Sequence, residues 1–257
     1  VFFFFLLTSP SYILMDKKTR TILLEKNANE KRAIASMTKI MSLLIIMESI
    51  EYNVARALLD IKAVQLRPHE PFTWASGWKS PIYCDNRKIL SYPEVRKTIA
   101  DYLVHTVEEY FKDVDVIAGV ATGAIALGIM VAERMNKPFV YVRPKAKNHG
   151  MCAQVEGYLP ENSRVVVIED LISTGGSSLS AVDALSKAGA EVLGMVAIFS
   201  YNFAKARKSC EDANVVLYTL SNYDALVEEA VKCNYISEDV VEVLKEWRFR
   251  PDTWGQE

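Results

Sequence analysis

The chain has 257 residues, enough for one large domain or for one domain with an appendage. Half of the residues are hydrophobic and 24% are charged, which is ordinary for a globular protein with a substantial core. The formal net charge of -2 gives no global attraction to nucleic acid or to an anionic membrane, so any basic site has to be local. The four cysteines are far apart and form no Cys-x-x-Cys pair. The sequence therefore indicates neither a zinc site nor a disulfide framework and favours a reducing cytoplasm.

The N-terminal stretch differs from the rest of the chain. Its first residues, Val1 to Leu7, form an apolar run too short to span a bilayer, and no stable membrane association is expected. Two short strands in a hairpin-like pattern are expected at 12–15 and 21–24, before an apolar helix that begins near Ser36. From Met47 onward the sequence has the pattern of a complete second protein, with Met47 as a plausible native start. We therefore expect a truncated, non-functional fragment over residues 1–46 and one domain over residues 47–257.

In the second part, two helices are expected before the first long strand. Apolar residues between Ala55 and Leu66 fall on one face of the first helix, and the second begins at Pro93 with Ser91 as its cap. A segment marked by Gly and Pro, 72–85, lies between them. The pattern then alternates, with strands expected at 116–120, 139–142, 165–168, 192–199 and 215–219 and helices at 123–135, 179–188, 203–210 and within 221–247. This alternation predicts an α/β fold with a mostly parallel, doubly wound sheet.

The most informative stretch is the central strand and the loop after it. The β-branched run 165–168 is typical of a parallel strand buried on both faces. Two acids, Glu169 and Asp170, follow at the carboxyl end, where open α/β sheets place ligand sites. The small residues 173–178 then allow backbone N–H groups to converge on a phosphate before a helix that begins near Ser178. Because the acids cannot bind that phosphate themselves, the simplest ligand pairs a phosphate with neighbouring hydroxyls, as a ribose 5-phosphate does.

The loop before this strand is long and basic. It contains Arg143-Pro144-Lys145-Ala146-Lys147-Asn148-His149-Gly150 and continues to Gly157. Loops of this length inside a compact α/β domain are usually functional, and these cations suit a multiply charged anion. Gly150 and Gly157 are candidate hinges for a lid.

Together these motifs resemble the orotate phosphoribosyltransferase family. The resemblance covers residues 47–257 and rests on Phe72-Thr73-Trp74-Ala75-Ser76-Gly77 with Ser80-Pro81-Ile82-Tyr83, on Arg143-x-Lys145-x-Lys147-x-His149-Gly150, and on Glu169-Asp170-Leu171-Ile172-Ser173-Thr174-Gly175-Gly176-Ser177. It implies the type I phosphoribosyltransferase fold, with a flexible lid loop and a small N-terminal hood. It also implies Mg²⁺-dependent transfer of the phosphoribosyl group from phosphoribosyl pyrophosphate (PRPP) to orotate, which gives orotidine 5'-phosphate and pyrophosphate in pyrimidine biosynthesis.

The resemblance also implies residue roles, with Lys147, His149 and Asp170 as the catalytic set. Arg143, Lys147 and His149 would contact the pyrophosphate of PRPP, and the lid would complete the neighbouring site of a homodimer. Glu169 and Asp170 would hold the ribose hydroxyls. The remaining PRPP contacts would come from Leu171, Ile172, Ser173, Thr174, Gly175, Gly176 and Ser177, with Ser173 also near orotate. No residue is assigned as a metal ligand.

Three positions depart from the pattern of some family members. Ala75 and Gly123 stand where those members carry Lys, and Tyr201-Asn202 stands where they place an Arg that grips the orotate carboxylate. Recognition of orotate is therefore less defined by this sequence than recognition of PRPP. The residue that grips the carboxylate is left open.

The N-terminal fragment resembles the beginning of a penicillin-binding D-alanyl-D-alanine carboxypeptidase. The matching segments are Ile13-Leu14-Met15-Asp16, Glu25-Lys26-Asn27-Ala28 and Ala35-Ser36-Met37-Thr38-Lys39. In that family the Ser of Ser-x-x-Lys is acylated and the Lys helps to take its proton. The family also needs a Lys-Thr-Gly, which this chain lacks, and a Ser-x-Asn, which occurs only at Ser200-Tyr201-Asn202 within the other domain's strand pattern. A serine D,D-carboxypeptidase acting through Ser36 is a remote alternative.

Two further alternatives share the expected fold. A PRPP-sensing regulator would carry a basic nucleic-acid surface or an added helix-turn-helix, and the N-terminal appendage resembles neither. A phosphoribosyltransferase for purines or uracil is the other alternative, and the Lys147-Asn148-His149-Gly150 lid argues against it.

Overall fold

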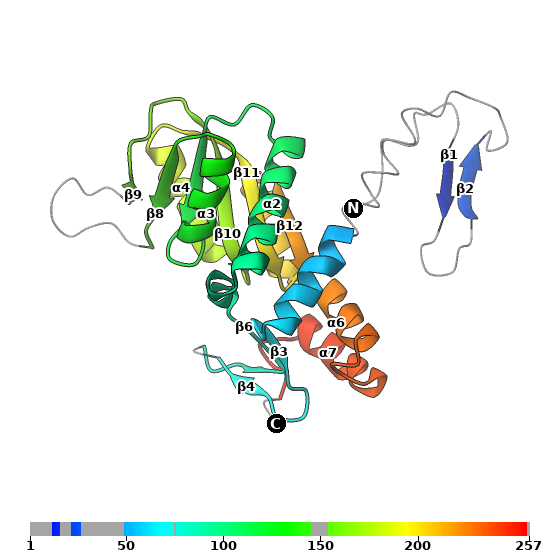
Figure 1. The fold of residues 1–257 in the computed structure, drawn as a ribbon. Coiled ribbons are helices and arrows are strands. Elements are labelled where there is room, and N and C mark those ends of the chain that lie inside the picture. Colours follow the sequence, from blue (N-terminus) through cyan, green and yellow to red (C-terminus); the bar gives the residue numbers. More distant parts are fainter. Residues whose placement is uncertain (1–11, 16–21, 27–48, 75, 145–153, 256–257) are drawn as a thin grey trace. The chain divides into compact units, whose positions relative to one another are not determined.

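The computed structural model describes residues 12–15, 22–26, 49–74, 76–144 and 154–255 (Figure 1). The chain forms two compact units, Val1–Ile46 and Met47–Glu257. In the first unit, β1 (Tyr12–Met15) pairs antiparallel with β2 (Ile22–Lys26), which confirms the two expected strands. Ser36 and Met47 lie outside the described residues.

A six-stranded sheet with the order β12-β11-β10-β7-β8-β9 organises the second unit. Its strands are β7 (Val116–Val120), β8 (Phe139–Val142), β9 (Val155–Glu156), β10 (Arg164–Ile172), β11 (Glu191–Ser200) and β12 (Leu217–Asn222). All neighbouring pairs are parallel except β8 with β9. The expected mostly parallel sheet is confirmed. The two-residue strand β9 was not expected, because it lies within the basic loop and is too short to leave a pattern.

Helices cover both faces of this sheet (Figure 1). On one face, α2 (Pro93–Tyr110) and α3 (Ile125–Arg134) share a core cluster with Val166 and Ile168 of β10. On the other face, α4 (Gly176–Lys187) and α5 (Ala204–Asp212) share a second cluster with Val165 and Val167. Alternate residues of a strand point to opposite faces, so the β-branched run of β10 supplies both cores. The doubly wound arrangement is thereby confirmed.

The chain changes its direction of travel across the sheet between β7 and β10. From β7 it passes through α3 to β8 on one side, and from β10 it passes through α4, β11 and α5 to β12 on the other. Open α/β sheets bind ligands outside the carboxyl ends of their strands at such a switch point. The fold therefore places its ligand crevice where β7 and β10 end.

A smaller layer stands at this end of the sheet. It comprises a helix over residues 49–60, the paired strands β3 (Val64–Leu66) and β6 (Ile82–Cys84), the hairpin of β4 (Phe72–Thr73) and β5 (Lys79–Ser80), and the 3-10 helix η2 (Asn86–Ser91). We refer to residues 49–91 as the hood. Downstream of β12 come α6 (Tyr223–Lys232), the 3-10 helix η3 (Glu238–Val240) and α7 (Val241–Phe249).

Several local expectations need correction. The first helix ends at residue 60, because Lys62 has a positive φ of 54°, and Leu66 belongs to a strand instead. Ser91 does not cap α2, whose N-cap is Tyr92 without a side-chain hydrogen bond. Helix α4 begins at Gly176 rather than near Ser178. Strand β10 continues to Ile172, so the two acids lie inside the strand's carboxyl-terminal part.

Aromatic packing fixes the hood against the end of the sheet. The fully buried ring of Trp247 in α7 lies 5.6 Å from the ring of Trp74 and 5.8 Å from that of Tyr201. Its Nε1 donates a hydrogen bond to the carbonyl oxygen of Lys79 at 3.2 Å, and the Trp74 Nε1 donates to that of Ile82 at 3.1 Å. Since both indoles are also hydrogen-bonded to hood backbone, the hood, β11 and α7 pack as one body.

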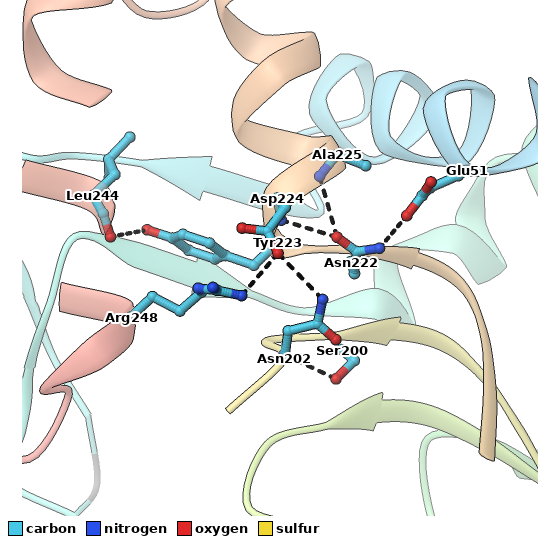
Figure 2. A network of polar contacts seen from close by, with 9 residues as sticks. All are labelled: Glu51, Ser200, Asn202, Asn222, Tyr223, Asp224, Ala225, Leu244 and Arg248. Atoms are coloured by element: carbon cyan, nitrogen blue, oxygen red, sulfur yellow. Dashed lines mark hydrogen bonds and ion pairs between the residues drawn. The ribbon is translucent and has the colours of Figure 1, made fainter. Parts of the chain in front are cut away.

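A polar network reinforces this junction at the carboxyl ends of β11 and β12 (Figure 2). Asn222 caps α6 by accepting hydrogen bonds from the backbone N–H groups of Asp224 and Ala225 at 2.9 and 3.2 Å, and its amide donates to Glu51. Asp224 in turn pairs with Arg248 of α7 at 2.8 Å. The helix over 49–60, β12, α6 and α7 are thus joined by one set of contacts.

Candidate active site

A cavity of about 480 Å³ opens at the switch point. Three segments supply its walls: the residues after β6, the end of β7, and the end of β10 with the following loop. Its lining residues are Cys84, Asp85, Asn86, Arg87, Val120, Ala121, Thr122, Gly123, Glu169, Asp170, Leu171, Ser173, Thr174, Gly175 and Ser177. The structure therefore brings the acid pair and most of the small-residue loop into one cavity.

Glu169 is the more deeply buried of the two acids, with 4% of its surface exposed. One carboxyl oxygen, Oε1, accepts a hydrogen bond from the backbone N–H of Asp170 at 2.9 Å, and Oε2 accepts one from the Ser178 hydroxyl at 2.7 Å. Burial, followed by the hydrogen bond and the charge of Asp170, raises the pKa of Glu169 to about 8. This shift favours the neutral form of the side chain, which lowers the negative charge of the cavity.

Asp170 is held at the cavity wall by contacts with its backbone and by the shape of its neighbour. The Asn86 side chain, itself 2% exposed, donates a hydrogen bond from Nδ2 to the Asp170 carbonyl oxygen at 2.6 Å. Gly123 lies against the side chain of Asp170, where an added Cβ would overlap the carboxylate. The hydrogen bond from the hood thus holds the backbone of Asp170 in place, and the absence of a side chain at Gly123 leaves room for the Asp170 carboxylate.

The loop after β10 has the backbone shape of an anion site. Gly175 is the N-cap of α4 and has a φ of +83°, a left-handed conformation that residues with a side chain rarely adopt. The first N–H groups of a helix lack partners within the helix and point toward its N-terminal end. Since the helix dipole adds positive potential there, this end of α4 can hold a phosphate. Ser173, Thr174, Gly175 and Ser177 line the cavity at this point.

Other residues predicted for the site do not line the cavity. Ile172 is fully buried in the core behind the loop, and Gly176 forms the first turn of α4. Arg143, at the end of β8, pairs through Nη1 with Oε1 of Glu156 at 3.4 Å. Lys147 and His149 lie outside the described residues.

Reasoning from the sequence missed the cavity residues that the hood provides. Asp85, Asn86 and Arg87 stand directly after β6 and line the cavity, with Arg87 Nε 2.6 Å from Oδ1 of Asp85. Their signal was the acid and base two residues apart, Asp85 and Arg87, which follow the Ser-Pro-Ile-Tyr motif after Cys84. Such a pair indicates a site only when a distant strand is known to face it.

Tyr201 and Asn202, the pair at the position of the orotate-gripping Arg, serve the packing of this chain. The Tyr201 ring is 3% exposed and lies 5.3 Å from that of Trp74. The Asn202 side chain donates to Oδ2 of Asp224 at 3.3 Å within the network of Figure 2. Neither residue lines the cavity within the part of the chain that the structure describes.

These residues would not hold a cation in a preformed cage of protein ligands. Over the described ranges, no group of three or more His, Cys, Asp or Glu side chains is arranged to hold a metal ion. The cavity still presents carboxyl groups, including those of Asp85 and Asp170. This donor set fits Mg²⁺, which is usually bound by one or two carboxylates together with substrate phosphates. Among the described helices, none is long and apolar enough to cross a membrane.

Comparison with known proteins agrees with this geometry. A family model described as "Phosphoribosyl transferase domain" matches residues 85–231, and one for D-alanyl-D-alanine carboxypeptidase matches residues 6–62. Orotate phosphoribosyltransferase of Porphyromonas gingivalis is 54% identical over 209 residues, which is 81% of this chain and 100% of that protein. The Listeria innocua protein of the same name is 55% identical over 208 residues, with the same shares covered.

Among solved structures, orotate phosphoribosyltransferase from Aeropyrum pernix superposes with a TM-score of 0.63 at 28% identity, covering 72% of this chain and 99% of that chain. Leishmania donovani UMP synthase gives a TM-score of 0.66 at 27% identity, covering 77% of this chain and 42% of that one. The chain is therefore similar to orotate phosphoribosyltransferases in fold as well as in sequence.

Proposed function

Because this chain belongs to the orotate phosphoribosyltransferase family, we propose that it transfers the 5-phosphoribosyl group of PRPP to N1 of orotate, releasing pyrophosphate and forming orotidine 5'-phosphate. The observation that carries the proposal is the pairing of Asp170 with the N-terminus of α4 in one cavity at the switch point. A carboxylate beside an anion-binding helix end suits a sugar phosphate, whose hydroxyls and phosphate need opposite kinds of partner.

In this proposal each part of PRPP has its own partner. The loop from Ser173 to Ser177 binds the 5-phosphate through its backbone N–H groups. Asp170 accepts hydrogen bonds from the ribose hydroxyls, and Glu169, protonated at neutral pH, keeps the Asp170 backbone in position through the hydrogen bond at 2.9 Å. Ser173 lies beside the orotate.

Catalysis would be mainly electrostatic. As the bond from ribose C1 to the pyrophosphate oxygen breaks, negative charge develops on the leaving group and positive charge develops on the ribose ring. The Asp170 carboxylate favours the positive ring, while Arg143, Lys147 and His149 of the lid stabilise the leaving group. The electron pair of orotate N1 then forms the new bond to C1, and the N1 proton passes to the released pyrophosphate or to water, so no protein base is needed.

We propose Mg²⁺ as the cofactor, held by Asp170 and by the oxygen atoms of PRPP. The ion would neutralise part of the charge on the pyrophosphate as it leaves. The residues 1–46 take no part in this chemistry. We also propose a cytoplasmic enzyme, since Cys84, Cys210 and Cys233 are free thiols in the structure, as is usual in a reducing compartment.

The direct test is product formation by the full chain and by Asp170→Asn. The wild-type chain with PRPP, Mg²⁺ and orotate should form orotidine 5'-phosphate, and the variant should lose at least about a hundredfold in kcat/KM, or about 2.7 kcal/mol. The variant should stay folded, because the Asp170 side chain serves the ligand rather than the core. A variant that turns over at the wild-type rate would show that Asp170 has no role at the ribose.

A further inference from the structure

The charges that line the cavity are unbalanced for the ligand it is proposed to hold. Among the described residues that line it, Asp85 and Asp170 are acidic beside Glu169, whose raised pKa favours its neutral form, and Arg87 is the one Lys or Arg. PRPP brings a 5-phosphate and a pyrophosphate, which are both anionic. The helix end serves the 5-phosphate, so the pyrophosphate needs a cation on the wall formed by the hood and β7.

Arg87 has the position that such a cation requires. Its neighbour Asn86 is anchored to the Asp170 carbonyl oxygen at 2.6 Å, so the backbone of residue 87 is fixed beside the proposed ribose partner. The hydrogen bond to Asp85 and then the charge of Asp85, with the charge of Asp170 among the smaller causes, raise the pKa of the Arg87 guanidinium. Arg87 therefore lies within electrostatic reach of the carboxylate that would face ribose C1.

The side chain is also available to a ligand. The hydrogen bond to Asp85 is made by Nε, so the two terminal nitrogens make no recorded hydrogen bond to the described residues. The side chain is 62% exposed, which leaves it free to turn into the cavity. The planar guanidinium group of an arginine can donate two parallel hydrogen bonds to phosphate oxygens.

We propose that Arg87 is a further binding residue, which contacts the pyrophosphate group of PRPP from the subunit that holds the ribose. This inference rests on the proposed function and names a residue of the same site. The pyrophosphate carries more charge than the single carboxylate of orotate, so it gains more from the one cation of this wall. Gly123, which faces Asp170 from the end of β7, offers no side chain that could serve instead.

The test measures ligand binding by the full chain in the presence of Mg²⁺, by titration calorimetry. The ligands are PRPP, inorganic pyrophosphate, ribose 5-phosphate and orotidine 5'-phosphate. Arg87→Ala should bind PRPP and pyrophosphate roughly ten- to a hundredfold more weakly, as loss of a charged hydrogen-bonding pair implies. Its affinity for the two ligands that lack pyrophosphate should stay within about twofold, because those ligands do not reach Arg87.

Two variants serve as controls. Arg87→Lys keeps the charge without the fork and should fall between the wild type and Arg87→Ala. Arg56→Ala removes another exposed arginine, which pairs with Asp60 outside the cavity, and should leave the affinities for all four ligands unchanged.

Each other outcome overturns the proposal. Weaker binding of orotidine 5'-phosphate alone would assign Arg87 to the orotate carboxylate, and weaker binding of ribose 5-phosphate as well would make its role structural. Unchanged binding of all four ligands would leave it no role. If the wild type binds PRPP yet forms no product with orotate, the proposed function fails while the comparison of PRPP with ribose 5-phosphate still decides the role of Arg87.

Discussion

Replacing Glu169 with Gln should change how the stability of the protein depends on pH. The pKa of Glu169 is about 8 in the folded chain, against an ordinary value of 4.5, so between these values the folded state holds a proton that the unfolded state has lost. The free energy of unfolding then falls as the pH rises. The stabilisation by this proton is fully present below pH 4.5 and is lost once the pH exceeds about 8, the pKa of Glu169 in the folded state. A Gln side chain at this position has no proton to lose, so the stability of the variant lacks this fall.

The size of the effect follows from the two pKa values. Between about pH 5.5 and about pH 8, the free energy of unfolding of the wild type should fall by about 3 kcal/mol relative to that of the Gln variant, because of this one proton. The amide of Gln can replace the neutral acid, because its oxygen can accept from the Asp170 N–H and its NH₂ can donate to the Ser178 hydroxyl. At the lower pH the two proteins should therefore differ by less than about 1 kcal/mol.

The assay is urea unfolding of both full chains at a series of pH values, with the difference between them plotted against pH. Taking the difference cancels the titration of the groups that the two chains share. Asp170→Asn is the matched control: the charge of Asp170 contributes to the raised pKa of Glu169, so its removal should lower that pKa and make the fall in stability smaller. Parallel stability curves for the wild type and Glu169→Gln would refute a protonated Glu169.

Three further predictions concern the hood, the proposed lid and residues 1–46. Trp247→Ala should lower the free energy of unfolding, measured in urea, by about 3–5 kcal/mol. As a control, Phe249→Ala, at a side chain that is 75% exposed, should change it by less than about 0.5 kcal/mol. Equal effects of the two substitutions would contradict the packing role of Trp247. If the lid serves the neighbouring subunit, inactive Lys147→Ala and Asp170→Asn chains that exchange subunits should recover about a quarter of wild-type activity, by counting intact sites in a two-fold dimer; no recovery despite verified exchange would place Lys147 in its own subunit's site. A chain that starts at Met47 should keep its turnover, and Ser36 of the full chain should not be labelled by a fluorescent penicillin. A tenfold loss, about 1.4 kcal/mol, or a stable adduct would show that residues 1–46 have a function.

The central sheet could be predicted because its signals are local. The β-branched run of β10 is hydrophobic on both faces, so its burial between two helical layers follows from sequence alone. The acids after this run and the small residues before α4 are neighbours in the chain, and the chain direction at a strand end brings them together.

The hood could not be predicted in the same way. Its strands β4 and β5 have two residues each, too few for a periodic pattern, and their position depends on indole contacts with a helix far along the chain, as in the hydrogen bond from Trp247 to Lys79, 168 residues apart. The cavity wall of Asp85, Asn86 and Arg87 depends likewise on the contact of Asn86 with Asp170, 84 residues away. Pairings of this kind are set by the tertiary fold, and a single sequence carries no local trace of them.

Pyrophosphate release from PRPP and Mg²⁺ with a panel of orotate, uracil, adenine and hypoxanthine is the most direct measurement of the central proposal. The wild-type chain should release pyrophosphate with orotate at a kcat/KM at least about a hundredfold above that with any other base, a difference of about 2.7 kcal/mol in transition-state binding. Equal or faster release with uracil or a purine, or binding of PRPP without release with any base, would contradict it.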